Sequence, residues 1–243
     1  MSDADFSLVD DVTPPIPEES VNVVSAYNLR AYQAECLKAI DTGWEDDVRA
    51  QLACLATGTG KTILFSALAK METGRGGRTL ILAHTDELID QAIDKLFNST
   101  GLKAAKEKAN FYASRWEKVV VGSVQTMSGD LRLSSWPANH FSLIVVDEAH
   151  RTLAASYQKI LKHFAAARVV GVTATADRGD KRALGDFYQK VTYDYGLLNA
   201  VRDGWLVRPI VKTLPLSIDL RGVKMKHSTD GNDLDRMEVG RRL

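Results

Sequence analysis

The sequence predicts a layered α/β domain with a mostly parallel sheet and helices on both faces. Short apolar runs recur along the chain, and each is followed by turn residues and a helix-like segment. Most of these runs lack the alternation of a half-exposed strand, as expected for strands buried on both faces of a parallel sheet. Strands that alternate with helices are typical of layered α/β domains. The runs are Gln51–Leu55, Thr79–Ala83, Val119–Val121, Leu143–Val146 and Val169–Val172.

Composition and patterning divide the chain into three stretches. Residues 1–26 are acidic and contain prolines without a helical or strand period, which predicts a flexible acidic arm. Regular patterning begins at Tyr27, with apolar residues at helical spacing over Leu29–Ile40, and continues to Lys212. Residues 27–212 are therefore predicted to form the domain. Residues 213–243 are polar and contain glycines, which predicts a linker or a truncated tail.

The overall composition excludes several classes of protein. Hydrophobic residues make up 45% and charged residues 26%, the ordinary balance of a globular protein. Because 31 basic side chains balance 31 acidic ones, any contact with nucleic acid has to come from a local surface. Cys36 and Cys54 have no companions at metal-ligand spacing, so we expect both to be buried in a reducing compartment. No stretch reaches the roughly 20 apolar residues that cross a bilayer, and we expect a cytoplasmic protein.

The strongest local signal is the segment Ala-Thr-Gly-Thr-Gly-Lys-Thr at residues 56–62. It lies between an apolar run and a helix-like stretch, the context that a phosphate-binding loop requires. Gly58 and Gly60 allow successive backbone N–H groups to point at phosphate oxygens. Lys61 would supply a cation for the β- and γ-phosphates of ATP, and the hydroxyl of Thr62 is a suitable ligand for Mg²⁺. The predicted ATP-binding residues of this loop are Thr57, Gly58, Thr59, Gly60, Lys61 and Thr62.

This segment departs from the general phosphate-loop pattern at one position. Leu55 stands six residues before the lysine, where the pattern has a glycine. A glycine-rich turn with an unrelated lysine therefore stays open as the alternative.

Two neighbouring carboxylates form the second signal. Asp147 and Glu148 end an apolar run in the segment Ile-Val-Val-Asp-Glu-Ala-His at residues 144–150. The carboxyl ends of parallel strands meet at one edge of the sheet, so these side chains are expected beside the phosphate loop. Asp147 would help to hold Mg²⁺, and Glu148 would orient and deprotonate an attacking water. The alternative is a strand that ends in a solvated acidic turn. The predicted catalytic residues are these two carboxylates, Asp147 and Glu148, and the lysine of the loop, Lys61.

With these residues in place, the chain resembles the DEAD/DEAH-type superfamily 2 helicases and translocases from Tyr27 to Lys212. The resemblance is strongest to the branch with type I and III restriction motor subunits and XPB-like helicases. It implies a RecA-like P-loop NTPase fold, with ATP and Mg²⁺ as cofactors. The segment Leu-Arg-Ala-Tyr-Gln at residues 29–33 resembles the adenine-reading motif of that branch, which implies that Gln33 bonds the adenine edge with Arg30 nearby. From the pattern alone, an amphipathic helix start with a solvated glutamine is the alternative.

The resemblance also implies nucleic-acid contacts on two further segments. Residues 82–88 resemble motif Ia, in which His84 and Thr85 would contact the nucleic-acid backbone, although Asp86 stands where an arginine is usual. The segment that includes Gln125 and Thr126 resembles the part that follows one strand of nucleic acid before motif II. For both segments, a capping role at a helix N-terminus is the alternative.

Two motifs of the resemblance would couple ATP to nucleic acid. The segment Asp-Glu-Ala-His is motif II in full, and Thr173-Ala174-Thr175 matches motif III, although Ala176 replaces the usual proline. The hydroxyls of Thr173 and Thr175 would bond His150, so that the phosphate state could shift the strand contacts. A satisfied imidazole in the core is the alternative for His150.

The resemblance implies an ATP-dependent motor that moves on nucleic acid, with DNA favoured over RNA. It also implies that a second RecA-like domain supplies arginines that speed phosphoryl transfer by roughly 10³–10⁵-fold. No such domain fits after Lys212, so we expect the isolated chain to hydrolyse ATP weakly. The alternative function is a non-catalytic, single-lobe nucleotide- or nucleic-acid-binding regulatory module.

Overall fold

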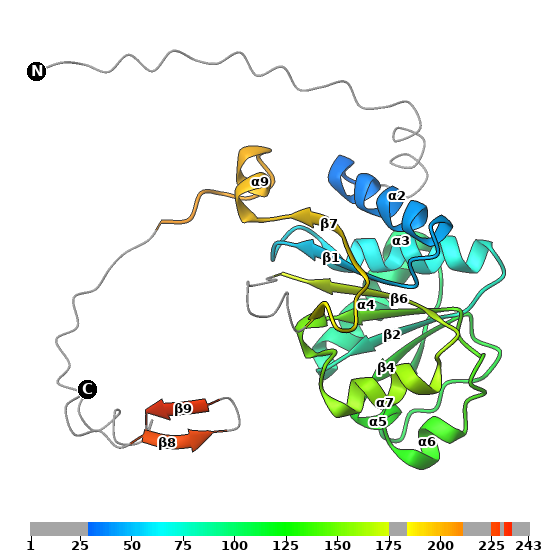
Figure 1. Ribbon diagram of the computed structural model, residues 1–243. Helices are drawn as coiled ribbons and strands as arrows, with labels where there is room; N and C mark the ends of the chain where they lie inside the picture. The colour runs from blue at the N-terminus through cyan, green and yellow to red at the C-terminus, as the bar shows by residue number, and fades with distance from the viewer. Residues whose placement is uncertain (1–28, 175–183, 211–224, 229–230, 235–243) are drawn as a thin grey trace, which may run out of the picture. The chain divides into compact units, whose positions relative to one another are not determined.

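The computed structural model describes residues 29–174 and 184–210, together with the backbone of residues 225–228 and 231–234 (Figure 1). The chain forms two compact units, Met1–Val207 and Arg208–Leu243, and each is described by itself. The arm predicted at residues 1–26 and the coupling residue Thr175 lie outside the described residues.

A seven-stranded parallel sheet forms the centre of the first unit. Its strands follow the order β3-β4-β2-β5-β6-β1-β7, and every pair of neighbours runs parallel. This arrangement confirms the predicted fold class. The strands are β1 (Ala50–Leu55), β2 (Thr79–Ala83), β3 (Ala105–Glu107), β4 (Val119–Ser123), β5 (Leu143–Asp147), β6 (Arg168–Thr173) and β7 (Lys190–Tyr195).

Helices cover both faces of this sheet (Figure 1). Successive residues of one strand point to opposite faces of the sheet. In β1, Leu55 packs with α2, α3 and α4, whereas Leu52 packs in the cluster that contains α5, α6 and α7. Both faces are thus buried, which is why the central strands are uniformly apolar. The helices are α2 (Ala31–Glu45), α3 (Lys61–Gly74), α4 (Asp86–Thr100), α5 (Val124–Met127), α6 (Asp130–Ser134), α7 (Ala155–His163), α9 (Leu197–Arg202) and the 3₁₀ helix η1 (Ala149–Arg151).

The order of the strands positions the loops that carry the predicted site. Strand β6 lies between β1 and β5, and its Val172 pairs with Ala53 on one side and with Asp147 on the other. The loop after β1 and the end of β5 therefore lie on either side of β6, at the same edge of the sheet.

Both edge strands, and a hairpin in the second unit, were not predicted from the sequence. Strand β3 has only three residues, and β7 is largely exposed, so neither shows the apolar run of a central strand. In the second unit, β8 (Met225–Ser228) and β9 (Gly231–Leu234) form an antiparallel hairpin within the stretch predicted as a linker or tail.

Two expectations from composition concern residues of the first unit. Cys36 and Cys54 are both buried, as predicted. Within the described residues, no helix combines the length and the apolar character that crossing a membrane requires.

Candidate active site

The loop between β1 and α3 passes through two glycines with left-handed backbone conformations. Gly58 has φ 86° and Gly60 has φ 79°, values that residues with a side chain rarely adopt. The buried hydroxyl of Thr59 donates to the carbonyl of Ala56 at 2.6 Å and closes the turn. Helix α3 begins at Lys61, so its unpaired N–H groups and the positive end of its dipole lie at this loop.

The position of Leu55 accounts for the departure from the general loop pattern. Leu55 is the last residue of β1, and its side chain is 1% exposed within the core. The turn begins only at Ala56, and the left-handed Gly58 supplies its curvature. A glycine at position 55 is therefore not required for this turn.

The first turn of α2 contacts the loop directly. Nε2 of Gln33 donates to the carbonyl of Thr59 at 2.9 Å, and the Tyr32 hydroxyl donates to the same carbonyl at 2.5 Å. Oε1 of Gln33 accepts the N–H of Arg30 at 2.9 Å. Gln33 is 3% exposed, so it is not the solvated glutamine of the alternative interpretation. The oxygen and the nitrogen of its side-chain amide both form hydrogen bonds within the protein. A contact of Gln33 with adenine stays a prediction.

The structure brings the predicted lysine and glutamate together. Nζ of Lys61 lies 3.7 Å from Oε1 of Glu148, with side chains that are 14% and 34% exposed. Asp147 ends β5, and its Oδ1 accepts the N–H of Glu148 at 2.9 Å. Burial raises the pKa of Asp147, an effect that the nearby Lys61 ammonium partly opposes. The three groups predicted to be catalytic therefore lie at one edge of the sheet.

Glu148 has a backbone conformation that is unusual for a residue with a side chain. Its φ is 52°, in the left-handed region, at the start of the short helix η1. Such a conformation costs about 1–3 kcal/mol and persists where the surroundings require it, often at functional sites. His150 Nδ1 lies 3.4 Å from Oε2 of Glu148, on the side chain's second oxygen. The His150 side chain is 36% exposed, so the alternative of a core imidazole is wrong.

A second group of predicted residues lines one cavity of about 240 Å³. Each ring nitrogen of His84 contacts another residue of this cavity. Its Nδ1 lies 3.3 Å from Nε2 of Gln125, and its Nε2 lies 3.2 Å from Nη1 of Arg151. An arginine always donates, so Nε2 of His84 accepts this hydrogen bond. The cavity is lined by His84, Val124, Gln125, His150, Arg151, Ala154, Ser156 and Tyr157.

The other predicted contact and coupling residues lie apart from this cavity. The Oγ1 of Thr85 accepts the N–H of Leu88 at 3.4 Å and so caps α4, as the capping interpretation expects. The Oγ1 of Thr126 accepts the N–H of Ala109 at 3.0 Å. Thr173 is fully buried at the end of β6. Because Thr175 is not described, the link from motif III to His150 stays a prediction.

Sequence reasoning missed several residues that border the site. The guanidinium of Arg30 lies 4.4 Å from the centre of the Trp205 ring, and a side chain at Gly58 would lie 3.1 Å from Leu206. Arg151 and the buried Tyr157 line the cavity beside His150. Arg151 directly follows the Asp-Glu-Ala-His segment and could have been found from that position. The approach of Trp205 and Leu206 to the loop has no sequence signal, because about 145 residues separate them.

The chain matches one family model and is similar in sequence to several curated proteins. Residues 26–178 match the family described as "Type III restriction enzyme, res subunit". The chain is 35% identical over 217 residues to the putative ATP-dependent helicase IRC3 of Saccharomyces cerevisiae, a match that covers 82% of this chain and 31% of that protein. It is 27% identical over 229 residues to the type I restriction enzyme EcoAI endonuclease subunit of Escherichia coli, covering 90% of this chain and 28% of that protein.

Solved structures share the fold at lower identity. A fragment of a putative HsdR subunit of a type I restriction enzyme from Vibrio vulnificus matches with a TM-score of 0.57 and 24% identity, covering 78% of this chain and 35% of that chain. The Hef helicase domain of Pyrococcus furiosus matches with a TM-score of 0.55 and 23% identity, covering 69% of this chain and 40% of that chain. These matches support the α/β fold described above.

Proposed function

The chain belongs to the family described as type III restriction enzyme, res subunit, and from this membership we propose that residues 27–212 are the ATP-binding motor domain of an ATP-dependent nucleic-acid helicase or translocase. The observation that carries the proposal is the 3.7 Å approach of Lys61 to Glu148 beside a loop with two left-handed glycines. This arrangement joins a phosphate-binding backbone, a cation and a candidate general base at one edge of the sheet.

The proposed chemistry is hydrolysis of the terminal phosphoanhydride bond of ATP. Backbone N–H groups of residues 57–62 would bind the phosphates, and the ammonium of Lys61 would reach the β- and γ-phosphate oxygens. Glu148 would orient a water molecule and accept its proton as the oxygen attacks the γ-phosphorus. The bond to the bridging oxygen then breaks, and the products are ADP and inorganic phosphate. Once a triphosphate attracts Lys61, the carboxylate of Glu148 is released to face the water.

The side chains at this edge fit a Mg²⁺ ion that arrives with ATP. Burial raises the pKa of Asp147, so a cation beside this carboxylate would stabilise its charged form. Thr62, the second residue of α3, would add its hydroxyl. Across residues 29–174 and 184–210, no group of three or more His, Cys, Asp or Glu side chains could hold a metal. This suits Mg²⁺, which usually takes one or two protein ligands together with phosphate oxygens and water. When bound, Mg²⁺ would neutralise charge on the phosphates.

A continuous set of contacts supports a link between the ATP site and nucleic acid. Lys61 contacts Glu148, and Glu148 contacts His150, which lies in the short helix η1. The same helix carries Arg151, which bonds His84 in the cavity proposed to lie on the nucleic-acid path. We infer that movement of Glu148 on ATP binding shifts η1 and, through Arg151, changes the position of His84.

Larger relatives suggest what accompanies this domain. The chain spans 31% of the length of the Saccharomyces cerevisiae relative and 28% of the length of the Escherichia coli relative. We infer that a second RecA-like domain provides arginines for phosphoryl transfer, and that the track is DNA. A relative from Sulfurisphaera tokodaii, 26% identical over 183 residues, is named a DNA 3'-5' translocase, which supports DNA.

Substitution of Glu148 by Gln tests the proposed function. We expect Glu148→Gln to keep the affinity for a fluorescent ATP analogue with Mg²⁺ and to lose nucleic-acid-stimulated ATP turnover by about 10²–10⁴-fold, the contribution of a general base. Glu45→Gln, at the exposed end of α2, is the matched control and should match the unmodified chain. The proposal fails if the analogue does not bind, or if Glu148→Gln leaves turnover unchanged. The second result would favour a non-catalytic binding module.

A further inference from the structure

The loop between β3 and β4, residues 108–118, presents aromatic rings to solvent. Phe111, Tyr112 and Trp116 are 58%, 75% and 85% exposed. Leu131, at the start of α6 nearby, is 90% exposed and borders the same cavity as Tyr112. Large apolar side chains that gather on a surface mark an interaction site. We call the surface formed by Tyr112, Arg115, Leu131 and Arg132, which border one cavity, the β3–β4 surface.

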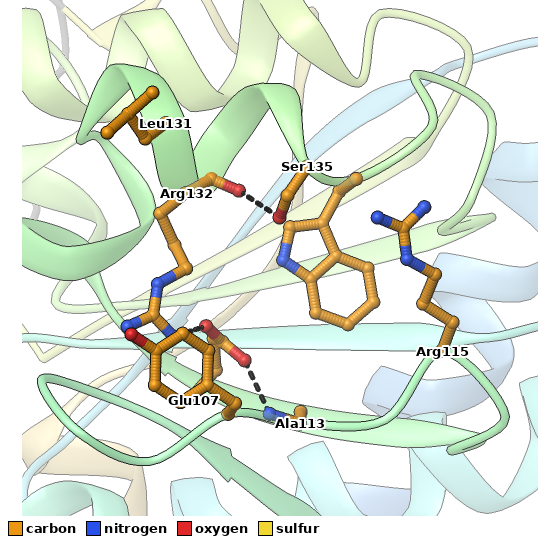
Figure 2. Close-up of a pocket in the computed structure, with 8 residues that line it drawn as sticks. Glu107, Ala113, Arg115, Leu131, Arg132 and Ser135 are labelled. Carbon is orange, nitrogen blue, oxygen red and sulfur yellow. Dashed lines mark hydrogen bonds and ion pairs between the residues drawn. The ribbon is translucent and has the colours of Figure 1, made fainter.

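A buried ion pair holds this loop in a fixed shape. Glu107, the last residue of β3, is 1% exposed and forms an ion pair with Arg132 (Figure 2). The other carboxylate oxygen of Glu107 accepts the N–H of Ala113 at 2.6 Å. Arg132 also donates to the carbonyls of Ala109 at 2.5 Å and Phe111 at 3.1 Å. The exposed rings therefore stand on an anchored backbone and are not on a loose loop.

The Arg132 guanidinium covers one face of the Tyr112 ring and leaves the other accessible. Its carbon lies 3.7 Å from the ring centre, within the range of a cation–π contact. Because Tyr112 remains 75% exposed, a flat group can stack on the outer face of the ring. The adjoining cavity of about 240 Å³ is smaller than the roughly 300–1,000 Å³ of small-molecule sites. It suits one planar ring better than a whole cofactor.

The charge of this region favours an anionic ligand. Residues 103–118 contain five basic side chains, of which Lys106 and Lys108 pair with carboxylates of α4, and two acidic ones, of which Glu107 is buried. Lys108 forms an ion pair with Asp86, the residue of the motif Ia segment that would repel a phosphate. Lys106 pairs with Asp90 on the same helix at 2.7 Å. These pairs offset two carboxylates along the predicted nucleic-acid path.

The β3–β4 surface is also continuous with the residues predicted to contact nucleic acid. The N–H of Ala109 donates to Oγ1 of Thr126 at 3.0 Å, so the loop begins against that segment. We propose that the β3–β4 surface binds single-stranded nucleic acid, with one base stacked on the outer face of Tyr112. Stacking on aromatic side chains beside basic groups is the usual mode for single strands and tolerates any sequence. This inference rests on the proposed function and names a binding surface for it.

Anisotropy with labelled oligonucleotides tests the stacking. The full chain is titrated into a single-stranded 12-nucleotide DNA and into an abasic strand with the same backbone, at low salt. We expect the abasic strand to bind about tenfold more weakly than normal DNA, as one lost stacking contact predicts. Tyr112→Ala should bind normal DNA about tenfold more weakly and lose most of the difference between the two strands. Tyr112→Phe keeps the ring and should bind like the unmodified chain.

Two further variants and one separate measurement complete the test. Trp116→Ala, which removes an exposed ring of the same loop outside the cavity, and Phe97→Ala, which removes a ring of α4 that is 52% exposed, should show no loss. Binding of the fluorescent ATP analogue should be the same in all variants, which separates this proposal from the proposed function. Equal affinity of Tyr112→Ala and the unmodified chain for normal DNA overturns the stacking proposal and assigns the surface to a protein partner. Absence of DNA binding by the unmodified chain also overturns it.

Discussion

The loop after β1 and the start of the β3–β4 loop lie at the same edge of the sheet and are anchored in different ways. The phosphate loop after β1 is held by an uncharged amide, because Gln33 and Tyr32 bond the carbonyl of Thr59. The β3–β4 loop is held by a charged pair, Glu107 with Arg132. Both anchors are almost fully buried, at 3% exposure for Gln33 and 1% for Glu107.

The two anchors leave different chemistry at the surface. The hydrogen bonds from Gln33 and Tyr32 end on a carbonyl of the phosphate loop and so use none of the N–H groups that a phosphate site requires. Arg132 of α6 bonds carbonyls of the β3–β4 loop and also supports the Tyr112 ring, so that loop presents a π surface. The first loop therefore suits the binding of phosphates, and the second suits the stacking of bases. The anchor of each loop can be removed separately.

Removal of the charged anchor should have the largest effect on stability. Glu107→Ala leaves the Arg132 guanidinium, whose side chain is 14% exposed, without its partner. Loss of one member of a buried pair costs about 3–5 kcal/mol of unfolding free energy. Chemical denaturation should show this loss. The double variant Glu107→Ala, Arg132→Met should recover part of it, whereas equal stability of the single and double variants would contradict a coupled pair.

An alanine at Gly60 should have the next largest effect, on the other loop. The φ of 79° is unfavourable for any residue with a side chain, and the added carbon would lie 2.7 Å from Nε2 of Gln33. We expect about 2–3 kcal/mol of destabilisation from strain together with the displaced anchor. The fluorescent ATP analogue should also bind more weakly. Gly74→Ala, where added atoms meet open space within α3, is the control and should be neutral or stabilising.

The sequence predicts the phosphate loop better than the β3–β4 loop. The phosphate loop has a short local pattern, and residues 56–62 together with Asp147 and Glu148 predicted the edge on which Lys61 and Glu148 meet. The central strands were also predictable, because burial on both faces makes them continuously apolar.

The β3–β4 loop and the edge strands lack such a pattern. Strand β3 is the three-residue segment Ala-Lys-Glu, and its role depends on Arg132, which lies 25 residues further along the chain. Only one of the six residues of β7 is buried and three are exposed, so its composition resembles that of a loop. The anchoring function of Gln33 was likewise hidden, since its partner Thr59 is 26 residues away. Pairings at such separations depend on the fold and leave no local signal.

Removal of the uncharged anchor should have a moderate effect. Gln33→Ala deletes the hydrogen bonds to Thr59 and to the N–H of Arg30, and it leaves a small cavity. We expect about 1–3 kcal/mol of destabilisation, less than for Glu107→Ala because no charge is left buried. Thermal unfolding with and without MgATP measures both stability and ligand stabilisation. A larger loss in Gln33→Ala than in Glu107→Ala would reverse the ranking of the two anchors.

The smallest expected effect is a gain in stability at Ala109. This residue has φ 45°, so the β3–β4 loop uses an alanine where the phosphate loop uses glycines. A left-handed conformation costs an alanine about 1–2 kcal/mol, and glycine avoids this cost but loses more entropy on folding. Ala109→Gly should therefore stabilise the chain by about 0.5–1 kcal/mol in denaturant unfolding. Ala166→Gly, at an exposed turn without a positive φ, should destabilise by a similar amount. If both variants lose stability equally, the left-handed backbone of Ala109 is not strained, and the two loops differ in their anchors alone.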